Sequence, residues 1–276
     1  MHNVNANGAS IPALGLGTWT LKGEECSALV SHALSIGYRH VDTARRYDNE
    51  VAVGAGLRAS GIARDELFVT TKVWWTDIAP GDLERSAEAS LKDLGLDQVD
   101  LLLIHWPNPS IPLEGSIKAL NAARRMGLAR HIGVANFPSG LLARAIALSE
   151  APLVCNQVEY HPYLDQSKLL RLCRENGVAL VSYCPLFRDG GLFNEKAVRD
   201  AAARHGKTPG QIVLRWHVQQ DGVSAIPRTS KAARLAENID IFDFALSDME
   251  MAAISALTSQ NKRLCDDDFA PEWDAA

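Results

Sequence analysis

The 276-residue chain has no hydrophobic run long enough to cross a membrane and no strongly basic region. No stretch approaches the run of about eighteen apolar residues that a transmembrane helix needs. The first residues, Met1–Asn5, lack the basic and apolar segments of a signal peptide. The net charge of −5 gives no broad cationic surface for a polynucleotide. We therefore expect a cytoplasmic protein whose partners are neither membranes nor nucleic acids.

Patterns typical of disulfide frameworks and metal sites are also missing. The cysteines are widely spaced, form no C-x-x-C pair and have no cluster of histidines beside them; they are Cys26, Cys155, Cys173, Cys184 and Cys265. An odd number of scattered cysteines indicates reduced, mostly buried thiols rather than disulfides or a zinc site. We expect no metal cofactor.

What is present is a regular alternation of predicted strands and helices. Hydrophobic residues at 47% and charged residues at 22% are ordinary for a soluble globular enzyme. Strands are predicted at residues 38–43, 67–72, 99–105, 129–135, 153–159, 178–184 and 223–227. Helices are predicted near 24–36, 50–60, 80–94, 113–126, 138–149, 166–176 and 194–219, the last split near Thr208-Pro209.

This alternation favours a (β/α)₈ barrel, for which roughly 250 residues is typical. The strand at 99–105 is apolar at nearly every position, as in parallel sheets covered on both faces. A short eighth strand is placed at Ile239–Phe242, after a brief helix at 231–238. No linker or repeat divides the chain, so we expect one domain over residues 1–276.

The first residues are predicted to form a hairpin before the barrel. It covers residues 2–17, with its turn at Asn7-Gly8. A doubly wound open sheet is the alternative to the barrel. The segment Gly15–Thr20 does not complete the glycine motif with which such a sheet would bind a dinucleotide.

Four polar residues follow or end the first predicted strands: Asp42, Tyr47, Lys72 and His105. In a parallel barrel the C-terminal strand ends share one face, so these side chains are expected to meet. Lys72 would then neutralise Asp42 and lower the pKa of the Tyr47 phenol from its reference of about 10. His105 could orient a carbonyl oxygen. Taken singly, Asp42 and Lys72 could also be a structural ion pair, and His105 a core residue.

Together these groups suit protonation of an oxygen while a hydride attacks carbon, and no serine or cysteine lies in a nucleophile elbow. At this point the chain resembles the aldo-keto reductase family over essentially its whole length. The matching segments are Gly15–Trp19, Asp42–Ala44, Tyr47, Asn49-Glu50, Thr71-Lys72, Leu102–Pro107, Gly133–Phe137, Asn156–Pro162, Ser182–Leu186, Ile226–Ser230, Arg234 and Glu237-Asn238. Among bacterial members it is most similar to the 2,5-diketo-D-gluconate reductases, including the ending Ala270–Asp274.

The resemblance implies a barrel whose hairpin closes its bottom, NADPH across the top, and a catalytic tetrad of Asp42, Tyr47, Lys72 and His105. In such proteins the tyrosine protonates the carbonyl oxygen while the nicotinamide delivers hydride to carbon. The implied cofactor-binding residues are Thr18, Trp19, Asn136, Gln157, Tyr183, Cys184, Leu186, Arg228, Thr229, Arg234, Glu237 and Asn238. Arg228, Thr229 and Arg234 would contact the adenosine 2′-phosphate. Ala135 and Cys184 stand where serine is frequent.

The predicted substrate pocket contains Trp19, Trp74, Trp106 and Arg46, with Trp273 as a further candidate. Arg46 would favour carboxylate-bearing substrates, but taken singly it and Arg188 are interpreted as solvated surface charges. The implied function is reduction of small aldehydes, ketones or dicarbonyls, of the 2,5-diketo-D-gluconate or methylglyoxal type, by a monomer. A cofactor-binding regulatory subunit with little catalysis is the alternative, and a barrel isomerase or hydrolase is a third possibility.

Overall fold

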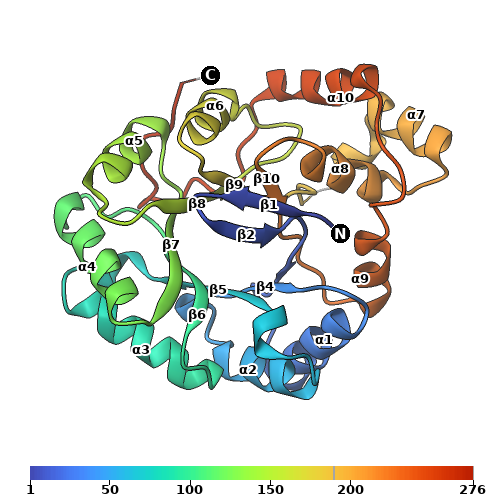
Figure 1. The fold of residues 1–276 in the computed structure, drawn as a ribbon. Helices are drawn as coiled ribbons and strands as arrows, with labels where there is room; N and C mark the ends of the chain where they lie inside the picture. The colour runs from blue at the N-terminus through green and yellow to red at the C-terminus, as the bar shows by residue number, and fades with distance from the viewer. Residues whose placement is uncertain (189, 276) are drawn as a thin grey trace.

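Within residues 1–188 and 190–275, which the computed structural model describes, eight parallel strands form one sheet in chain order. They are β3 (Leu16–Gly17), β4 (His40–Asp42), β5 (Phe68–Val73), β6 (Val99–Ile104), β7 (Ala129–Ala135), β8 (Leu153–Glu159), β9 (Ala179–Tyr183) and β10 (Val223–Ala225). Figure 1 shows these strands at the centre of the molecule with the helices around them.

The two edge strands of this sheet meet, so the sheet closes on itself. Gly15 N–H donates to the carbonyl oxygen of Ala225 at 2.9 Å, and Gly17 N–H to that of Pro227 at 3.1 Å. The approach requires glycine, because a Cβ at Gly17 would lie 2.8 Å from the carbonyl oxygen of Ile226. The predicted (β/α)₈ barrel is confirmed.

The eighth strand was predicted in the wrong place. Ile239–Phe242 forms no strand, because Ile239 ends a helix and the following residues form turns and bends. The missing strand is β3, inside the segment 2–17 that was predicted to be a hairpin. A strand of two residues, one of them glycine, is too short for side-chain alternation to reveal it.

Helices connect the strands and cover the outside of the barrel. They are α1 (Gly23–Ser35), α2 (Glu50–Ala59), α3 (Asp82–Leu94), α4 (Leu113–Arg125), α5 (Ser139–Leu148), α6 (Ser167–Glu175), α7 (Lys196–His205), α8 (Pro209–Val218), α9 (Ala232–Ile239) and α10 (Asp248–Ser255). The predicted division near Thr208-Pro209 is confirmed, since the Thr208 side chain caps α8. Helix α10 was not predicted. None of the described helices is long and apolar enough to span a bilayer.

The N-terminal hairpin covers the bottom of the barrel. It pairs β1 (Asn3–Ala6) with β2 (Ala9–Pro12) in antiparallel register. At its turn, Asn7 Nδ2 donates to the carbonyl oxygens of Leu153 at 2.9 Å and Asn176 at 3.0 Å. Leu153 begins β8, so the hairpin lies at the N-terminal ends of the strands and leaves the opposite face open to a site.

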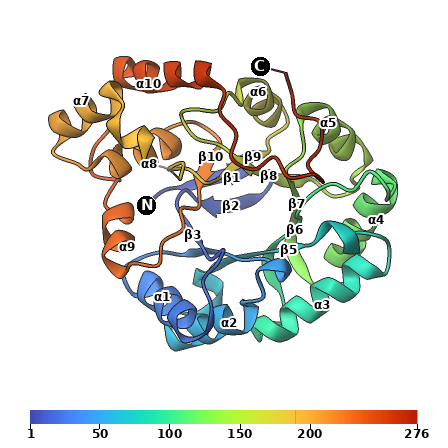
Figure 2. The ribbon, with the colours of Figure 1, turned by 180° about the vertical axis from the view of Figure 1, so that it is seen from behind.

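The C-terminal segment, residues 261–275, crosses that opposite face. Figure 2 shows it passing from α10 across the ends of the strands toward α5. Near its end, Asp274 accepts hydrogen bonds from Ser139 N–H at 2.7 Å and from Ser139 Oγ at 2.6 Å. These donors lie at the start of α5, where the helix dipole favours a carboxylate. The segment is therefore attached to the barrel rather than extended into solvent.

Candidate active site

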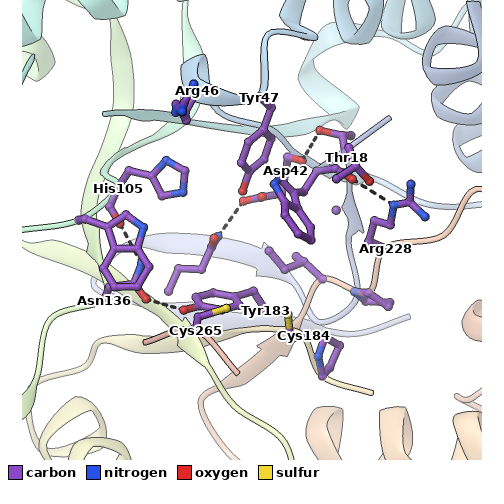
Figure 3. A pocket seen from close by; sticks show the side chains of 18 of the residues that line it. Thr18, Asp42, Arg46, Tyr47, His105, Asn136, Tyr183, Cys184, Arg228 and Cys265 are labelled. Carbon is purple, nitrogen blue, oxygen red and sulfur yellow. Dashed lines mark hydrogen bonds between the residues drawn. The ribbon is translucent and has the colours of Figure 1, made fainter. Parts of the chain in front are cut away.

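A cavity of about 580 Å³ opens at the C-terminal ends of the strands. This volume is within the usual range for small-molecule sites, about 300–1,000 Å³. Most of the predicted site residues line it: Thr18, Trp19, Asp42, Arg46, Tyr47, Trp74, His105, Trp106, Asn136, Gln157, Tyr183, Cys184, Leu186 and Arg228. In Figure 3, many of these side chains point into the same cavity.

A buried ion pair lies against this cavity and joins β4 to β5. Lys72 Nζ is 2.6 Å from Asp42 Oδ1 and donates to the carbonyl oxygen of Thr43 at 2.8 Å. The other oxygen of Asp42 accepts a hydrogen bond from Gln157 Nε2 at 2.7 Å. Burial alone would lower the pKa of Lys72, but Asp42 and Tyr47 raise it, so the amine stays charged. Lys72 lies behind the cavity lining and acts on it through these two neighbours.

Tyr47 approaches the pair from η1 (Arg45–Tyr47), the short 3-10 helix after β4. Its hydroxyl lies 3.4 Å from Lys72 Nζ. Burial raises the pKa of this phenol and outweighs the opposing effect of the Lys72 charge. The expectation of a lowered pKa was therefore wrong, because it counted the ammonium and not the loss of water. Tyr47 keeps its proton at neutral pH.

His105 follows β6 and faces Tyr47 across the cavity. The two rings meet edge to face with centroids 5.6 Å apart. Burial lowers the pKa of His105 well below its ordinary value, and the charges of Lys72 and Arg46 lower it further. The imidazole is therefore neutral at physiological pH. Its Nδ1 is buried without a hydrogen-bond partner in the described part of the chain, which leaves Nε2 as the nitrogen that reaches the cavity.

Two amides and a tyrosine form the adjoining wall. Asn136 follows β7 and adopts a left-handed backbone conformation, with φ of 63°. Its Nδ2 donates to the carbonyl oxygen of His105 at 2.9 Å, and its Oδ1 accepts from the Tyr183 hydroxyl at 2.7 Å. These bonds fix the Asn136 amide and the Tyr183 ring relative to His105. Gln157 is fixed in the same way by its bond to Asp42.

The rim near β3 carries Thr18, Trp19 and Arg228. Thr18 is buried, and both its N–H and its hydroxyl donate to the carbonyl oxygen of Asp42 at 3.0 Å. Arg228 Nε donates to the carbonyl oxygen of Trp19 at 3.0 Å. No other partner of this guanidinium lies among the described residues, so its terminal nitrogens are available to a ligand.

The loop after β9 supplies Cys184, Leu186 and Arg188 to the cavity. Cys184 is half-buried and has a positive φ of 49°. Arg188 extends over the indole of Trp19, with 4.8 Å between the guanidinium carbon and the ring centroid. Arg188 is exposed, as expected for a solvated surface charge, but it also lines the cavity. The fold brings it to the cavity from a loop whose path the sequence does not reveal.

The remaining predicted cofactor residues lie outside the cavity lining, on the segment from Thr229 to Asn238. This segment contains α9 and continues from Arg228 at the rim. Arg234 Nε lies 3.6 Å from Glu237 Oε2. Glu237 also accepts a hydrogen bond from the Thr208 hydroxyl at 2.6 Å. The structure thus separates these residues from the polar cluster around Asp42.

Aromatic rings form the other side of the cavity, and sequence reasoning missed one of them. Phe269, in the C-terminal segment, packs against Trp74 and Trp106 at centroid distances of 5.5 and 5.3 Å. It stacks on Trp75 at 5.4 Å. Trp273 packs behind Trp106 and does not line the cavity. No local motif predicts that Phe269 lines the cavity. It reaches the cavity because the C-terminal segment returns across the barrel.

Arg46 lies at the mouth, beside the aromatic wall. Its guanidinium carbon is 5.4 Å from the centroid of Trp74. The positive charge of Arg46 helps to lower the pKa of His105, so Arg46 affects the protonation of this tetrad residue. Within the described residues Arg46 forms no ion pair, whereas its neighbour Arg45 bonds to Glu50 and Asp93. The Arg46 side chain therefore offers an uncompensated positive charge to whatever enters.

The amino-acid sequence matches a known protein family. Residues 13–259 match the model of the Aldo/keto reductase family. Methylglyoxal reductase DkgB of Yersinia pestis is 39% identical over 268 residues, which cover 96% of this chain and 100% of that protein.

Solved structures give the same result. A provisionally named 2,5-diketo-D-gluconic acid reductase B superposes with a TM-score of 0.96 at 46% identity, covering 100% of this chain and 98% of the other. An aldo-keto reductase from Bombyx mori, in complex with NADP, has a TM-score of 0.89 at 36% identity, covering 96% and 94%.

Proposed function

Since this chain belongs to the aldo/keto reductase family, we propose that it reduces small aldehydes, ketones or dicarbonyls to alcohols with NADPH, with Tyr47 as the general acid. It is an oxidoreductase acting on carbonyl groups. The observation that carries the proposal is the Tyr47 hydroxyl, which lines the cavity within 3.4 Å of a buried ammonium and faces a neutral histidine.

Tyr47 is suited to donate a proton to a carbonyl oxygen. Its raised pKa means that the hydroxyl is fully protonated before reaction. When the proton leaves, Lys72 Nζ stabilises the resulting tyrosinate by charge and by its hydrogen bond. Asp42 and the carbonyl oxygen of Thr43 hold this ammonium in place. The ion pair therefore supports the charge that develops in the transition state.

His105 is suited to position the substrate. Because its imidazole is neutral, one ring nitrogen carries a proton, and with that proton on Nε2 the side chain donates into the cavity. A carbonyl oxygen between Nε2 and the Tyr47 hydroxyl would accept from both. Two donors at one oxygen increase its polarisation and fix the direction from which the carbon is attacked.

The residues present fit a nicotinamide cofactor. Asn136 and Gln157 each keep donor or acceptor capacity beyond the bonds described above, as a carboxamide requires. The ring of Tyr183 gives a flat surface beside them, and Thr18, Trp19, Cys184 and Leu186 complete this part of the cavity. When bound, NADPH supplies the hydride that the carbonyl carbon gains. The protein orients the ring and excludes water.

The phosphate-bearing end of the cofactor would lie along Arg228–Asn238. Arg228 offers terminal nitrogens to a phosphate, with Thr229 and Arg234 beside it on the segment that opens α9. Glu237 and Asn238 would contact the adenine and its ribose. Two arginines favour a cofactor that carries the additional 2′-phosphate, so we expect NADPH to be preferred over NADH.

The substrate would enter between the aromatic wall and Arg46. Trp74 and Trp106 provide apolar surface, while the Arg46 guanidinium at the mouth attracts a carboxylate. This combination fits a keto-acid such as 2,5-diketo-D-gluconate as well as a small dicarbonyl such as methylglyoxal. We also propose that residues 1–276 act as one domain and as a monomer.

The proposal is tested by following the nicotinamide absorbance. Protein mixed with NADPH and either methylglyoxal or 2,5-diketo-D-gluconate is expected to consume NADPH, and a parallel series with NADH should turn over more slowly. Absence of turnover on a broad panel of carbonyl compounds would contradict catalysis. NADPH binding, measured separately by fluorescence quenching, distinguishes an inactive binding protein from one that does not use the cofactor.

A further inference from the structure

Two cysteines from distant parts of the chain meet in the cavity wall. Cys184 follows β9, and Cys265 belongs to the C-terminal segment. Both are half-buried and both line the cavity. Figure 3 shows the two thiols beside Tyr183. Cys184 borders the proposed nicotinamide site, but neither thiol takes part in the proton donation proposed for Tyr47 and His105, so the meeting of the two thiols requires a separate explanation.

One guanidinium contacts both sulfur atoms. Arg188 Nη2 lies 3.5 Å from Cys184 Sγ and 3.6 Å from Cys265 Sγ. Arg188 also contacts the indole of Trp19 and remains exposed to solvent. A positive charge next to a partly exposed thiol is the environment that makes cysteine reactive, because the thiolate is the nucleophile.

The two thiols differ in their acidity. The neighbouring Cys265 thiol lowers the pKa of Cys184 to about 7, against the effect of burial, and the Arg188 charge lowers it further. The Cys184 side chain raises the pKa of Cys265 in turn, and so does burial. Both sulfurs lie within 3.6 Å of the same Arg188 Nη2, and the opposite directions of the two shifts make Cys184 the more acidic thiol of the pair.

Cys265 is fixed in this place by a buried carboxylate. The N–H groups of Leu264 and Cys265 donate to the two oxygens of Glu159 at 2.7 and 2.8 Å. Glu159 is fully buried at the end of β8 and is also 2.9 Å from His161 Nε2. Burial would raise the pKa of Glu159, but these hydrogen bonds lower it, so it remains an acceptor. The position of the second thiol is therefore built into the barrel.

The other cysteines provide an internal contrast. Cys26, Cys155 and Cys173 are buried and free. Burial raises the pKa of Cys26 to about 11 and that of Cys173 to about 12, and it raises that of Cys155 as well. None of them lines the cavity. They are expected to be inert under conditions that modify the cavity thiols.

We propose that Cys184 and Cys265 are an oxidisable thiol pair that a hydroperoxide converts to a disulfide. The Cys184 thiolate attacks the peroxide oxygen, which forms a sulfenic acid and releases hydroxide or alkoxide. The Cys265 thiol then attacks the Cys184 sulfur, forming the S–S bond and releasing water. Two electrons pass from the two sulfurs to the peroxide, and a dithiol reductant reverses the change.

The test uses the full chain, reduced and then treated with hydrogen peroxide at pH 7. After the peroxide is removed and the protein is denatured so that every thiol is accessible, thiol titration is expected to fall from five groups to three, and peptide mapping should find one Cys184–Cys265 linkage. Dithiothreitol should restore all five. A titration that stays at five, or a disulfide between other cysteines, would overturn the proposal.

Two variants assign the roles within the pair. In Cys265→Ser, peroxide should leave a sulfenic acid on Cys184, which dimedone captures, whereas Cys184→Ser should give no dimedone adduct at Cys265. Equal labelling of both cysteines would contradict the assignment. Circular dichroism of each variant checks that it is folded.

The contribution of Arg188 is tested by the pH dependence of Cys184 alkylation with iodoacetamide. In the native protein the midpoint should lie near 7. In Arg188→Gln it should move upward, because the thiolate loses its counter-charge. At pH 7 the Cys184 thiol of the native protein should react about sixfold faster than an ordinary cysteine. A larger fraction of Cys184 is thiolate at this pH, and the lower nucleophilicity of a more acidic thiolate offsets part of that gain. An unshifted midpoint in the variant would overturn this part of the proposal.

Discussion

Two walls of the cavity are formed by different kinds of structural element. The tetrad wall, Asp42, Tyr47, Lys72 and His105, comes from strand ends or the short helix after β4, and its ion pair is fully buried. The thiol wall, Cys184, Arg188 and Cys265, comes from the loop after β9 and the C-terminal segment, and its members are half-buried or exposed.

The difference lies in how firmly the fold holds the side chains of each wall. Strand ends of a barrel hold side chains rigidly, and the tetrad wall uses this rigidity to keep a charge and a hydroxyl in contact. Loops can change without disturbing the barrel, so a soft, oxidisable pair can be placed beside the reaction at little cost in stability. We therefore expect changes in the tetrad wall to have large effects, and changes at the loops to have small or conditional ones.

The largest effect should come from Tyr47→Phe. Loss of the general acid is expected to reduce kcat by roughly 10²–10⁴-fold, while NADPH affinity, measured by fluorescence quenching, stays the same. Tyr160→Phe is the matched control, because it removes a hydroxyl that bonds to Gln220 at 2.8 Å outside the cavity. Retained activity in Tyr47→Phe would move the acid elsewhere, with His105 the first candidate.

Lys72→Met should cost the most stability. It leaves the Asp42 carboxylate buried without its cation, which typically costs about 3–5 kcal/mol. Urea unfolding measures this loss. Arg188→Met, in the thiol wall, should cost less than about 1 kcal/mol, because the side chain is exposed and its contacts are weak. Similar losses for the two variants would remove the distinction between the walls.

Arg46→Gln should change substrate preference rather than catalysis. The KM for 2,5-diketo-D-gluconate is expected to rise about tenfold, the lower end of the effect of a charged hydrogen bond. The KM for methylglyoxal, which carries no charge, should stay within about twofold by the same reasoning. If both KM values rise together, Arg46 shapes the mouth without selecting charge.

The smallest effect concerns pH. His105 has a lowered pKa and stays neutral, so kcat/KM should show no step from this residue between about pH 6 and 8. Stability behaves differently. Below the ordinary histidine pKa of about 6.5, the unfolded chain binds a proton that the folded chain does not, so stability falls as the pH falls. A rate step near 6.5 that disappears in His105→Gln would contradict a neutral imidazole.

Sequence reasoning predicted the tetrad wall better than the thiol wall. Asp42, Lys72 and His105 lie at or just after the ends of strands that the alternation along the chain predicts, and parallel strands bring such positions to one face. Cys265 and Phe269 lie in a segment without regular pattern. Their place in the cavity depends on Glu159, which holds the Leu264 and Cys265 backbone, and no local spacing predicts a contact between residues so distant in the chain.

The sequence by itself determined the alternation of strands and helices, the barrel that follows from it, and the residue types that can reduce a carbonyl. These depend on periodicity and order along the chain. The tertiary structure decided which two residues form β3, how Arg188 joins two thiols, and why the pKa of Tyr47 is raised rather than lowered. The closure of the barrel at β3, the contact of Arg188 with both thiols and the exclusion of water from Tyr47 all involve segments that are far apart in the chain. They therefore exist only once the barrel has formed.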